Sequence, residues 1–238
     1  MSSENALAIF DIDGTLTDTN AVDDECYCCA LGEALELTPD EIDWADAPHI
    51  TDSGITNWLW EKHRHRSPTR DDVSRVRSRF VELLSARLSA TPQRFAAVPG
   101  ARTVLPLLRA GGWHVALATG AWGASAALKL RAAEVSHADA PLACADDAST
   151  REEIVQIARR RGEVAARTTF QRVVSVGDGT WDVRTARALE MPFVGVGTGD
   201  RARLLREAGA TIVIESFDDW AGFRTALSEA TIPETGYR

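Results

Sequence analysis

Short apolar segments alternate with amphipathic ones over most of this 238-residue chain. Residues 6–10 are apolar at every position, which is typical of a strand buried on both faces of a parallel sheet. Similar segments occupy residues 113–118, 141–145, 173–176, 193–196 and 211–214. The strand pattern is weakest at 141–145. Helical patterns between them occupy residues 101–110, 123–133, 150–161, 181–189 and 201–207. The alternation predicts an α/β fold with a doubly wound parallel sheet that helices cover on both faces.

The stretch from residue 20 to residue 96 breaks this alternation. It shows no convincing strand pattern, and prolines separate helical patterns at residues 23–37, 54–62 and 71–89. We therefore expect two domains. An α/β core would comprise residues 1–19 and 97–238, and an inserted α-helical cap domain would comprise residues 20–96. We also expect residues 231–238 to form a frayed tail.

The composition is that of a soluble globular protein, with 45% hydrophobic and 26% charged residues. A net charge of −9 argues against nucleic acid as a partner, because nucleic-acid binding relies on a basic face. No secretory signal or membrane helix is apparent. Cys26, Cys28, Cys29 and Cys144 are a poor disulfide framework and favour reduced thiols in the cytoplasm. A monomer and a homodimer both stay open.

Polar residues follow three of the predicted strands. Asp11 and Asp13 come directly after the first strand, Thr119 after the next one, and Asp178 after the strand at 173–176, with Asp182 four residues later. Parallel strands bring their carboxyl ends to one edge of a sheet, so we expect these groups to converge. Carboxylates that close repel each other unless they share a cation or a proton. Oxygen ligands alone favour a hard cation, Mg²⁺ by default.

A simpler interpretation exists for the last pair of carboxylates. Asp178 or Thr180 could cap the start of the helix that follows, and Asp182 would then be favoured by the helix dipole. Taken alone, the two interpretations have about equal weight. The presence of Asp11 and Asp13 favours the ligand site.

Three motifs together resemble the haloacid dehalogenase superfamily. DIDGT at residues 11–15 is similar to its first motif, LATG at 117–120 to its second, and GDGTWD at 177–182 to its fourth. The order and spacing of these motifs are more specific than any one of them. The helical insertion after the first motif resembles the α-helical C1 cap of phosphoglycolate-phosphatase-like members.

The resemblance implies a Mg²⁺-dependent phosphatase that acts on a small phosphorylated metabolite. Asp11 would be the nucleophile that forms an aspartyl-phosphate, and Asp13 the general acid and then the base. Asp11, Asp178 and the backbone carbonyl of Asp13 would hold Mg²⁺, with Asp182 completing the shell. Thr119 and the Gly120 N–H would bind the phosphate. Because the family's dehalogenases lack an acid at position 13, Asp13 favours phosphate chemistry.

The third motif departs from the family pattern, which usually supplies a lysine. The chain has only two lysines, and Lys129 falls inside the helix after Thr119, which makes it a poor candidate. Arg151 opens a later helix and is better placed to bind phosphate as a catalytic cation. The alternative is a surface arginine beside Glu152 and Glu153.

Other functions stay open. A phosphotransferase or mutase of the same fold would need only a different acceptor. A phosphonatase would use Lys62, the lysine of the insertion, to form a Schiff base. A catalytically silent binding protein is the third alternative. The basic run at residues 62–66 is either a substrate contact or a solvated helix end. The thiols at residues 26–29 suit cap packing better than a zinc site.

Overall fold

The computed structural model describes residues 5–235, and its centre is a six-stranded parallel sheet with the order β5-β4-β1-β6-β7-β8. The strand at the middle, β1, pairs with β4 on one side and β6 on the other, so that Phe10 lies opposite both Leu117 and Val176. The strands are β1 (Ala6–Phe10), β4 (Trp113–Ala118), β5 (Leu142–Ala143), β6 (Arg172–Gly177), β7 (Phe193–Val196) and β8 (Val213–Ile214). The α/β fold with a doubly wound parallel sheet is confirmed.

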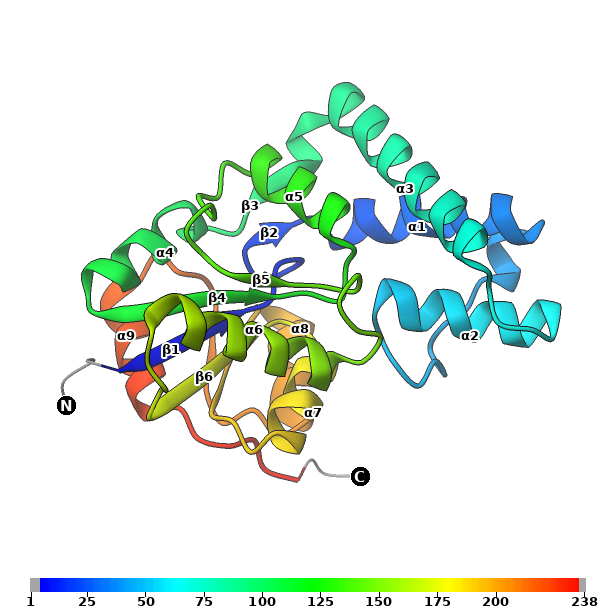
Figure 1. Ribbon diagram of the computed structural model, residues 1–238. Helices are drawn as coiled ribbons and strands as arrows, with labels where there is room; N and C mark the ends of the chain where they lie inside the picture. The colour runs from blue at the N-terminus through cyan, green and yellow to red at the C-terminus, as the bar shows by residue number, and fades with distance from the viewer. Residues whose placement is uncertain (1–4, 236–238) are drawn as a thin grey trace.

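Alternate residues of β1 pack under different helices, which explains why the strand is apolar throughout. Ala8 and Phe10 pack on one face with α4, α5 and α9, whereas Leu7 and Ile9 pack on the other with α6, α7 and α8. Figure 1 shows these helices around the sheet. They are α4 (Ala101–Ala110), α5 (Gly123–Ala132), α6 (Arg151–Ala166), α7 (Thr180–Ala188), α8 (Gly199–Glu207) and α9 (Trp220–Glu229).

Residues 20–96, which we call the cap segment, form a separate group of helices beside the sheet (Figure 1). They are α1 (Asn20–Leu35), α2 (Asp52–Arg64) and α3 (Arg70–Ala90), with 3₁₀ turns η1 (Pro39–Glu41) and η2 (Pro92–Phe95). Their buried apolar side chains form one cluster that includes Tyr27 and Phe80. Trp122 and Leu128 of the α/β part belong to the same cluster, so the cap segment packs firmly against the core.

The sequence patterns did not predict three elements. Strands β2 (Thr17–Asp18) and β3 (Ala96–Ala97) form a two-stranded antiparallel pair where the chain enters and leaves the cap segment. Both strands are only two residues long, which is too short to show a period of two. Helix α9 was also missed; its N-cap is Asp219, whose side chain accepts from the Gly222 N–H.

The expectation of a frayed tail is wrong for residues 231–235, and residues 236–238 lie outside the described part. The Phe193 N–H donates to the Thr231 carbonyl at 3.0 Å, and the Glu234 N–H donates to the Gly209 carbonyl at 2.9 Å. Arg187 also donates to the carbonyls of Pro233 and Glu234. Backbone hydrogen bonds therefore fix this segment, although its sequence shows neither a strand nor a helix pattern. Within residues 5–235, no helix has both the length and the apolar character needed to cross a bilayer.

Candidate active site

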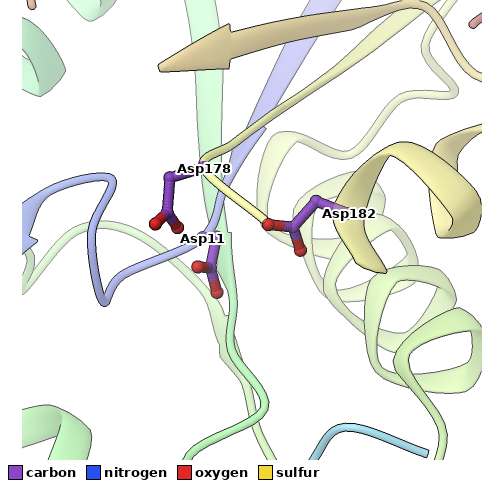
Figure 2. Close-up of side chains that lie close together, drawn as sticks. All are labelled: Asp11, Asp178 and Asp182. Atoms are coloured by element: carbon purple, nitrogen blue, oxygen red, sulfur yellow. The ribbon is translucent and has the colours of Figure 1, made fainter. Parts of the chain in front are cut away.

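Three buried carboxylates meet where β1 and β6 end. Asp11 follows β1, Asp178 follows β6, and Asp182 lies in the first turn of α7. Figure 2 shows the three side chains turned toward one another, and one oxygen from each lies within 4.8 Å of the others. Residues 167 positions apart therefore form one cluster, because the sheet places β1 beside β6.

The turn after β1 fits closely around Asp178. Thr15 Oγ1 and Asn20 Nδ2 donate to the two Asp178 oxygens at 3.3 and 3.1 Å. Gly14 has a φ of 76°, and a Cβ there would lie 2.0 Å from an Asp178 oxygen. Only glycine satisfies both the backbone conformation and the space, which explains the glycine of DIDGT.

The three carboxylates form an acidic centre whose charges are only partly compensated. Burial, followed by the charge of Asp182, raises the pKa of Asp11 well above its usual value, although Arg151 opposes this. Burial and then Asp182 also raise the pKa of Asp178 to about 7, and burial raises the pKa of Asp182. A divalent cation among the three oxygens would relieve this repulsion. A set of hard oxygen donors at this spacing fits Mg²⁺.

Among the described residues, two arginines reach this cluster. Arg201 Nη1 lies 3.3 Å from Asp178 Oδ2, and Arg151 contacts the other two carboxylates. Arg151 is the more buried of the two. Arg151 Nη1 donates to Asp11 Oδ1 at 3.1 Å and to Asp182 Oδ1 at 2.8 Å. The guanidinium also lies over the Trp181 ring, 5.6 Å from its centre. The side chain is largely buried, so the interpretation of Arg151 as a surface residue does not hold.

Thr119 and Gly120 lie beside the same cluster at the end of β4. Thr119 is 1% exposed, and its Oγ1 accepts from the Ala121 N–H at 3.1 Å. A Cβ at position 120 would lie 2.9 Å from both Arg151 Nη2 and the Ile50 carbonyl oxygen. The glycine therefore lets Arg151 and the cap segment approach the end of β4 closely.

Asp13 lies in a second group of charges, which the sequence did not reveal. Lys129 on α5 is fully buried and donates to Asp13 Oδ2 at 2.6 Å and to Asp23 Oδ1 of α1. Thr19 Oγ1 donates to the other Asp13 oxygen at 2.6 Å. These partners raise the pKa of Lys129 above its usual value despite the opposing effect of burial. Lys129 thus pairs with Asp13, whereas Arg151 pairs with Asp11 and Asp182.

Helical periodicity contains a signal for Lys129. It follows the buried Ser125 by four positions and the buried Ala126 by three, so it shares their face of α5. A lysine on a buried helix face needs acidic partners. The pattern alone could not identify those partners as Asp13 and Asp23.

The N-cap of α7 is Gly179, so the alternative in which Asp178 or Thr180 caps this helix is wrong. Asp182 lies in the first turn, as that alternative expected, and contributes to the cap. Its Oδ2 accepts from the Gly179 N–H at 3.0 Å at the start of α7. Its other oxygen accepts from Arg151 Nη1, which also donates to Asp11. Capping and membership of the cluster are therefore compatible for Asp182, whereas Asp178 contacts Thr15, Asn20 and Arg201.

The basic run at residues 62–66 ends α2 and lies away from this site. Lys62 lies over the Trp58 ring at 4.5 Å, Arg64 donates to the Leu35 carbonyl, and Arg66 pairs with Asp72. These contacts agree with the solvated helix end. Cys26, Cys28, Cys29 and Cys144 are free thiols.

A cavity of about 360 Å³ opens over the carboxylates, between the strand ends and the cap segment. The core contributes Asp11, Asp13, Thr119, Gly120, Ala121, Arg151, Thr180, Trp181 and Arg184. The cap segment contributes Asn20, Asp23, Asp24, Tyr27, Trp44, Ala45, Ile50, Thr51, Asp52 and Ile55. Asp178 and Asp182 lie behind this lining. Expected catalytic residues and residues of the cap segment therefore line the same cavity.

Solved structures with the same fold come from several bacteria. A hydrolase from Pseudomonas syringae shares 21% identity at a TM-score of 0.66, covering 93% of this chain and 98% of its own. A phosphonoacetaldehyde hydrolase-like protein from Oleispira antarctica shares 20% identity at a TM-score of 0.62, covering 95% and 93%. A predicted phosphoglycolate phosphatase from Haemophilus somnus shares 15% identity at a TM-score of 0.60, covering 94% and 99%.

No curated protein matches the chain. The family model for haloacid dehalogenase-like hydrolases matches residues 6–190, which include β1, the cap segment and all three strand ends described above. The chain therefore belongs to the haloacid dehalogenase-like hydrolases.

Proposed function

We propose that this protein is a Mg²⁺-dependent phosphatase that hydrolyses a small phosphate monoester through an aspartyl-phosphate. The observation that carries the proposal is the buried triad of Asp11, Asp178 and Asp182, together with Arg151, which donates to Asp11 and Asp182 and lines the cavity. Phosphoryl transfer needs positioned positive charge around the phosphate and one unhindered nucleophile. This site offers an arginine, a place for a divalent cation and a carboxylate facing the cavity.

The proposed chemistry begins at Asp11. One oxygen of its carboxylate attacks phosphorus, and the bond from phosphorus to the leaving alcohol breaks. Asp13 gives a proton to the alcohol oxygen, then takes a proton from the water that attacks the aspartyl-phosphate, which frees Asp11 and releases phosphate. Thr119, the Gly120 N–H and Arg151 hold the phosphate oxygens.

Mg²⁺, when bound, would neutralise charge on the transferring phosphoryl group. Asp11, Asp178 and the Asp13 carbonyl would hold it, and Asp182 would complete the shell. The chain's own residues prepare this site before the ion arrives. Thr15 and Asn20 orient Asp178, and the Gly179 N–H orients Asp182.

Two observations disfavour the phosphonatase alternative. Lys62 lies on Trp58 and does not line the cavity. Lys129 is close to Asp13, but its two carboxylate partners favour the protonated amine, and a Schiff base needs a neutral one. Neither lysine of the chain is therefore suited to that chemistry.

Release of phosphate from a panel of phosphorylated metabolites and an aryl phosphate tests the proposal. We expect release with Mg²⁺, loss of release with EDTA, and loss in Asp11→Asn. Asp18→Asn is the matched control, because Asp18 is exposed on β2 outside the cavity. Full activity of folded Asp11→Asn, or full activity in EDTA, would contradict the proposed mechanism. Transfer of phosphate to an added sugar or alcohol would indicate a phosphotransferase instead.

A further inference from the structure

The cavity has two chemically different ends. The core end holds Arg151 and the catalytic carboxylates, where the phosphate would bind under the proposed function. The other end is formed by the cap segment, so the alcohol of the substrate must lie against residues of that segment. The side chains on this wall therefore determine which leaving groups fit.

The cap wall carries carboxyl groups and no basic group. Asp23, Asp24 and Asp52 line it, whereas no lysine, arginine or histidine does so among the described residues of the cap segment. Asp23 is paired with Lys129, and Asp52 Oδ2 accepts from the Trp122 N–H at 2.8 Å. Within residues 5–235, the Asp24 side chain makes no hydrogen bond or ion pair, although its backbone belongs to α1. Its carboxylate is thus available to a ligand.

Aromatic side chains accompany this carboxylate. Tyr27 and Trp44 both line the cap wall, and their ring centres lie 5.7 Å apart. A cavity wall that holds both a carboxylate and aromatic rings is a suitable environment for an ammonium group, which is attracted to both. The same environment repels a carboxylate or a second phosphate, because their negative charges would face Asp24 without a compensating cation.

Arg184 is a feature of the cavity that favours an anionic substrate. It lines the core side of the cavity from α7 and is exposed. Its Nε and Nη2 contact the Thr180 carbonyl and hydroxyl at 3.3 Å, so its own helix already engages the guanidinium. The experiment below separates the influence of Arg184 from that of Asp24.

We infer that the substrate is a phosphate monoester of an amino alcohol, whose ammonium group binds Asp24 beside Tyr27 and Trp44. The inference rests on the proposed function, because it takes the carboxylate triad as the phosphate end. It adds the chemical class of the leaving group, which the fold does not specify. The cap wall would discriminate against phosphoglycolate and bisphosphates by charge.

The test compares kcat/KM for three esters of similar size: phosphoethanolamine, glycerol 1-phosphate and phosphoglycolate. Wild type should prefer them in that order, with at least about tenfold between the first and the last, since 1.4 kcal/mol corresponds to tenfold. In Asp24→Asn, kcat/KM for phosphoethanolamine should fall about fivefold, as for a partly exposed ion pair, while that for phosphoglycolate should not fall. Asp71→Asn removes an exposed charge from α3, away from the cavity, and should leave the order unchanged.

Any other order in the wild type, or an equal loss on all three esters in Asp24→Asn, overturns the inference. A preference for phosphoglycolate that disappears in Arg184→Gln would assign selectivity to Arg184. If no ester and no aryl phosphate is hydrolysed, the proposed function fails. The inference is then decided by calorimetric measurement of the affinity of wild type and Asp24→Asn for the three esters. The affinities of wild type should follow the same order as above, and Asp24→Asn should lose affinity for phosphoethanolamine only.

Discussion

The nitrogen atoms of Arg151 reach groups that one ammonium could not reach together. While Nη1 contacts Asp11 and Asp182, Nε donates to the Ile50 carbonyl of the cap segment at 3.0 Å. A lysine supplies the charge but only a single nitrogen. The arginine therefore connects the carboxylate triad with the cap segment.

Arg151→Lys should consequently retain some activity and Arg151→Met very little. We expect kcat/KM to fall about tenfold in the lysine variant, and by about 10²- to 10³-fold in the methionine variant, as when a donor to a transition state is lost. Steady-state kinetics with an aryl phosphate measures both. Arg159→Lys, on the exposed face of α6, is the control. Equal activity of Arg151→Met and wild type would remove Arg151 from the mechanism.

A second prediction for a single residue concerns Lys129. Lys129→Met leaves Asp13 and Asp23 without their shared partner, and breaking a buried pair in this way costs about 3–5 kcal/mol. The free energy of unfolding in urea should fall by that amount. Adding Asp23→Asn to Lys129→Met should recover part of the loss, because one unpaired carboxylate disappears. A single variant as stable as wild type would show that the pair contributes little.

Individual residues differ in how far the sequence could predict them. Asp11, Asp13, Thr119 and Asp178 could be predicted because each follows an apolar strand, and parallel strands end at one edge. Arg151 could be predicted from its place at the start of a helix. The contacts of Lys129 with Asp13 and Asp23 could not, because they depend on how α5 and α1 pack. The catalytic and ligand roles of all these residues stay predictions.

Among the elements, α3 begins with a capping box that also binds two arginines. Thr69 Oγ1 accepts from the Asp72 N–H, and Asp72 accepts from the Thr69 N–H, Arg66 and Arg75. These donors, Arg66 first, hold the pKa of Asp72 well below its usual value. The helix start therefore depends on an ionised carboxylate.

Asp72→Asn should destabilise the protein in a pH-dependent manner. Because the folded pKa is depressed, the contribution of Asp72 is present above the unfolded value of about 3.9 and is lost as the pH falls toward the folded value. We expect a loss of about 1 kcal/mol at pH 7, typical of a cap, and a smaller difference at pH 3.5. Urea unfolding at both values measures it. The neighbouring Asp71→Asn should show no such trend, and a pH-independent loss in Asp72→Asn would contradict the electrostatic argument.

The bounds of interior strands were easier to predict than those of edge strands. The predicted strands at 6–10, 113–118 and 193–196 match β1, β4 and β7. The predicted helix at 101–110 matches α4, since its apolar residues recur at the helical period and Gly111 follows its end. The predicted strand at 141–145 shortens to Leu142–Ala143, because only these residues pair with β4. Strand length depends on a partner's register, which one segment of sequence does not contain.

At the scale of the molecule, the start of α2 is where the cap segment meets the core. The Asp52 N–H donates to the Gly120 carbonyl at 2.7 Å, and Thr51 Oγ1 donates to the Ser149 carbonyl at 2.7 Å. The Trp122 indole N–H donates to Ser53 at 2.9 Å. These hydrogen bonds join α2 to the loops after β4 and β5.

Asp52 makes this contact sensitive to pH. Burial raises the pKa of Asp52 to about 7, so the stability that its neutral form provides is complete below about pH 4 and is lost as the pH rises through 7. Asp52→Asn can still accept from Trp122 and carries no charge. The free energy of unfolding of Asp52→Asn relative to wild type should therefore rise by about 2 kcal/mol from pH 5 to pH 8, as measured by urea unfolding. Asp40→Asn, on the exposed turn η1, is the control, and its free energy of unfolding relative to wild type should not change with pH. If the value for Asp52→Asn is the same at pH 5 and pH 8, the argument is refuted.

The antiparallel pair β2–β3 has a consequence for domain exchange. Thr17 pairs with Ala97 and Asp18 with Ala96, so the chain leaves and re-enters the core at neighbouring positions about 5 Å apart. A foreign helical unit could be spliced there without stretching the core. The graft would have to bring its own acid to the place of Asp23, because Lys129 would otherwise keep only Asp13 to balance a fully buried charge. A grafted cap without such an acid could bring a new specificity but would lower the stability of the core.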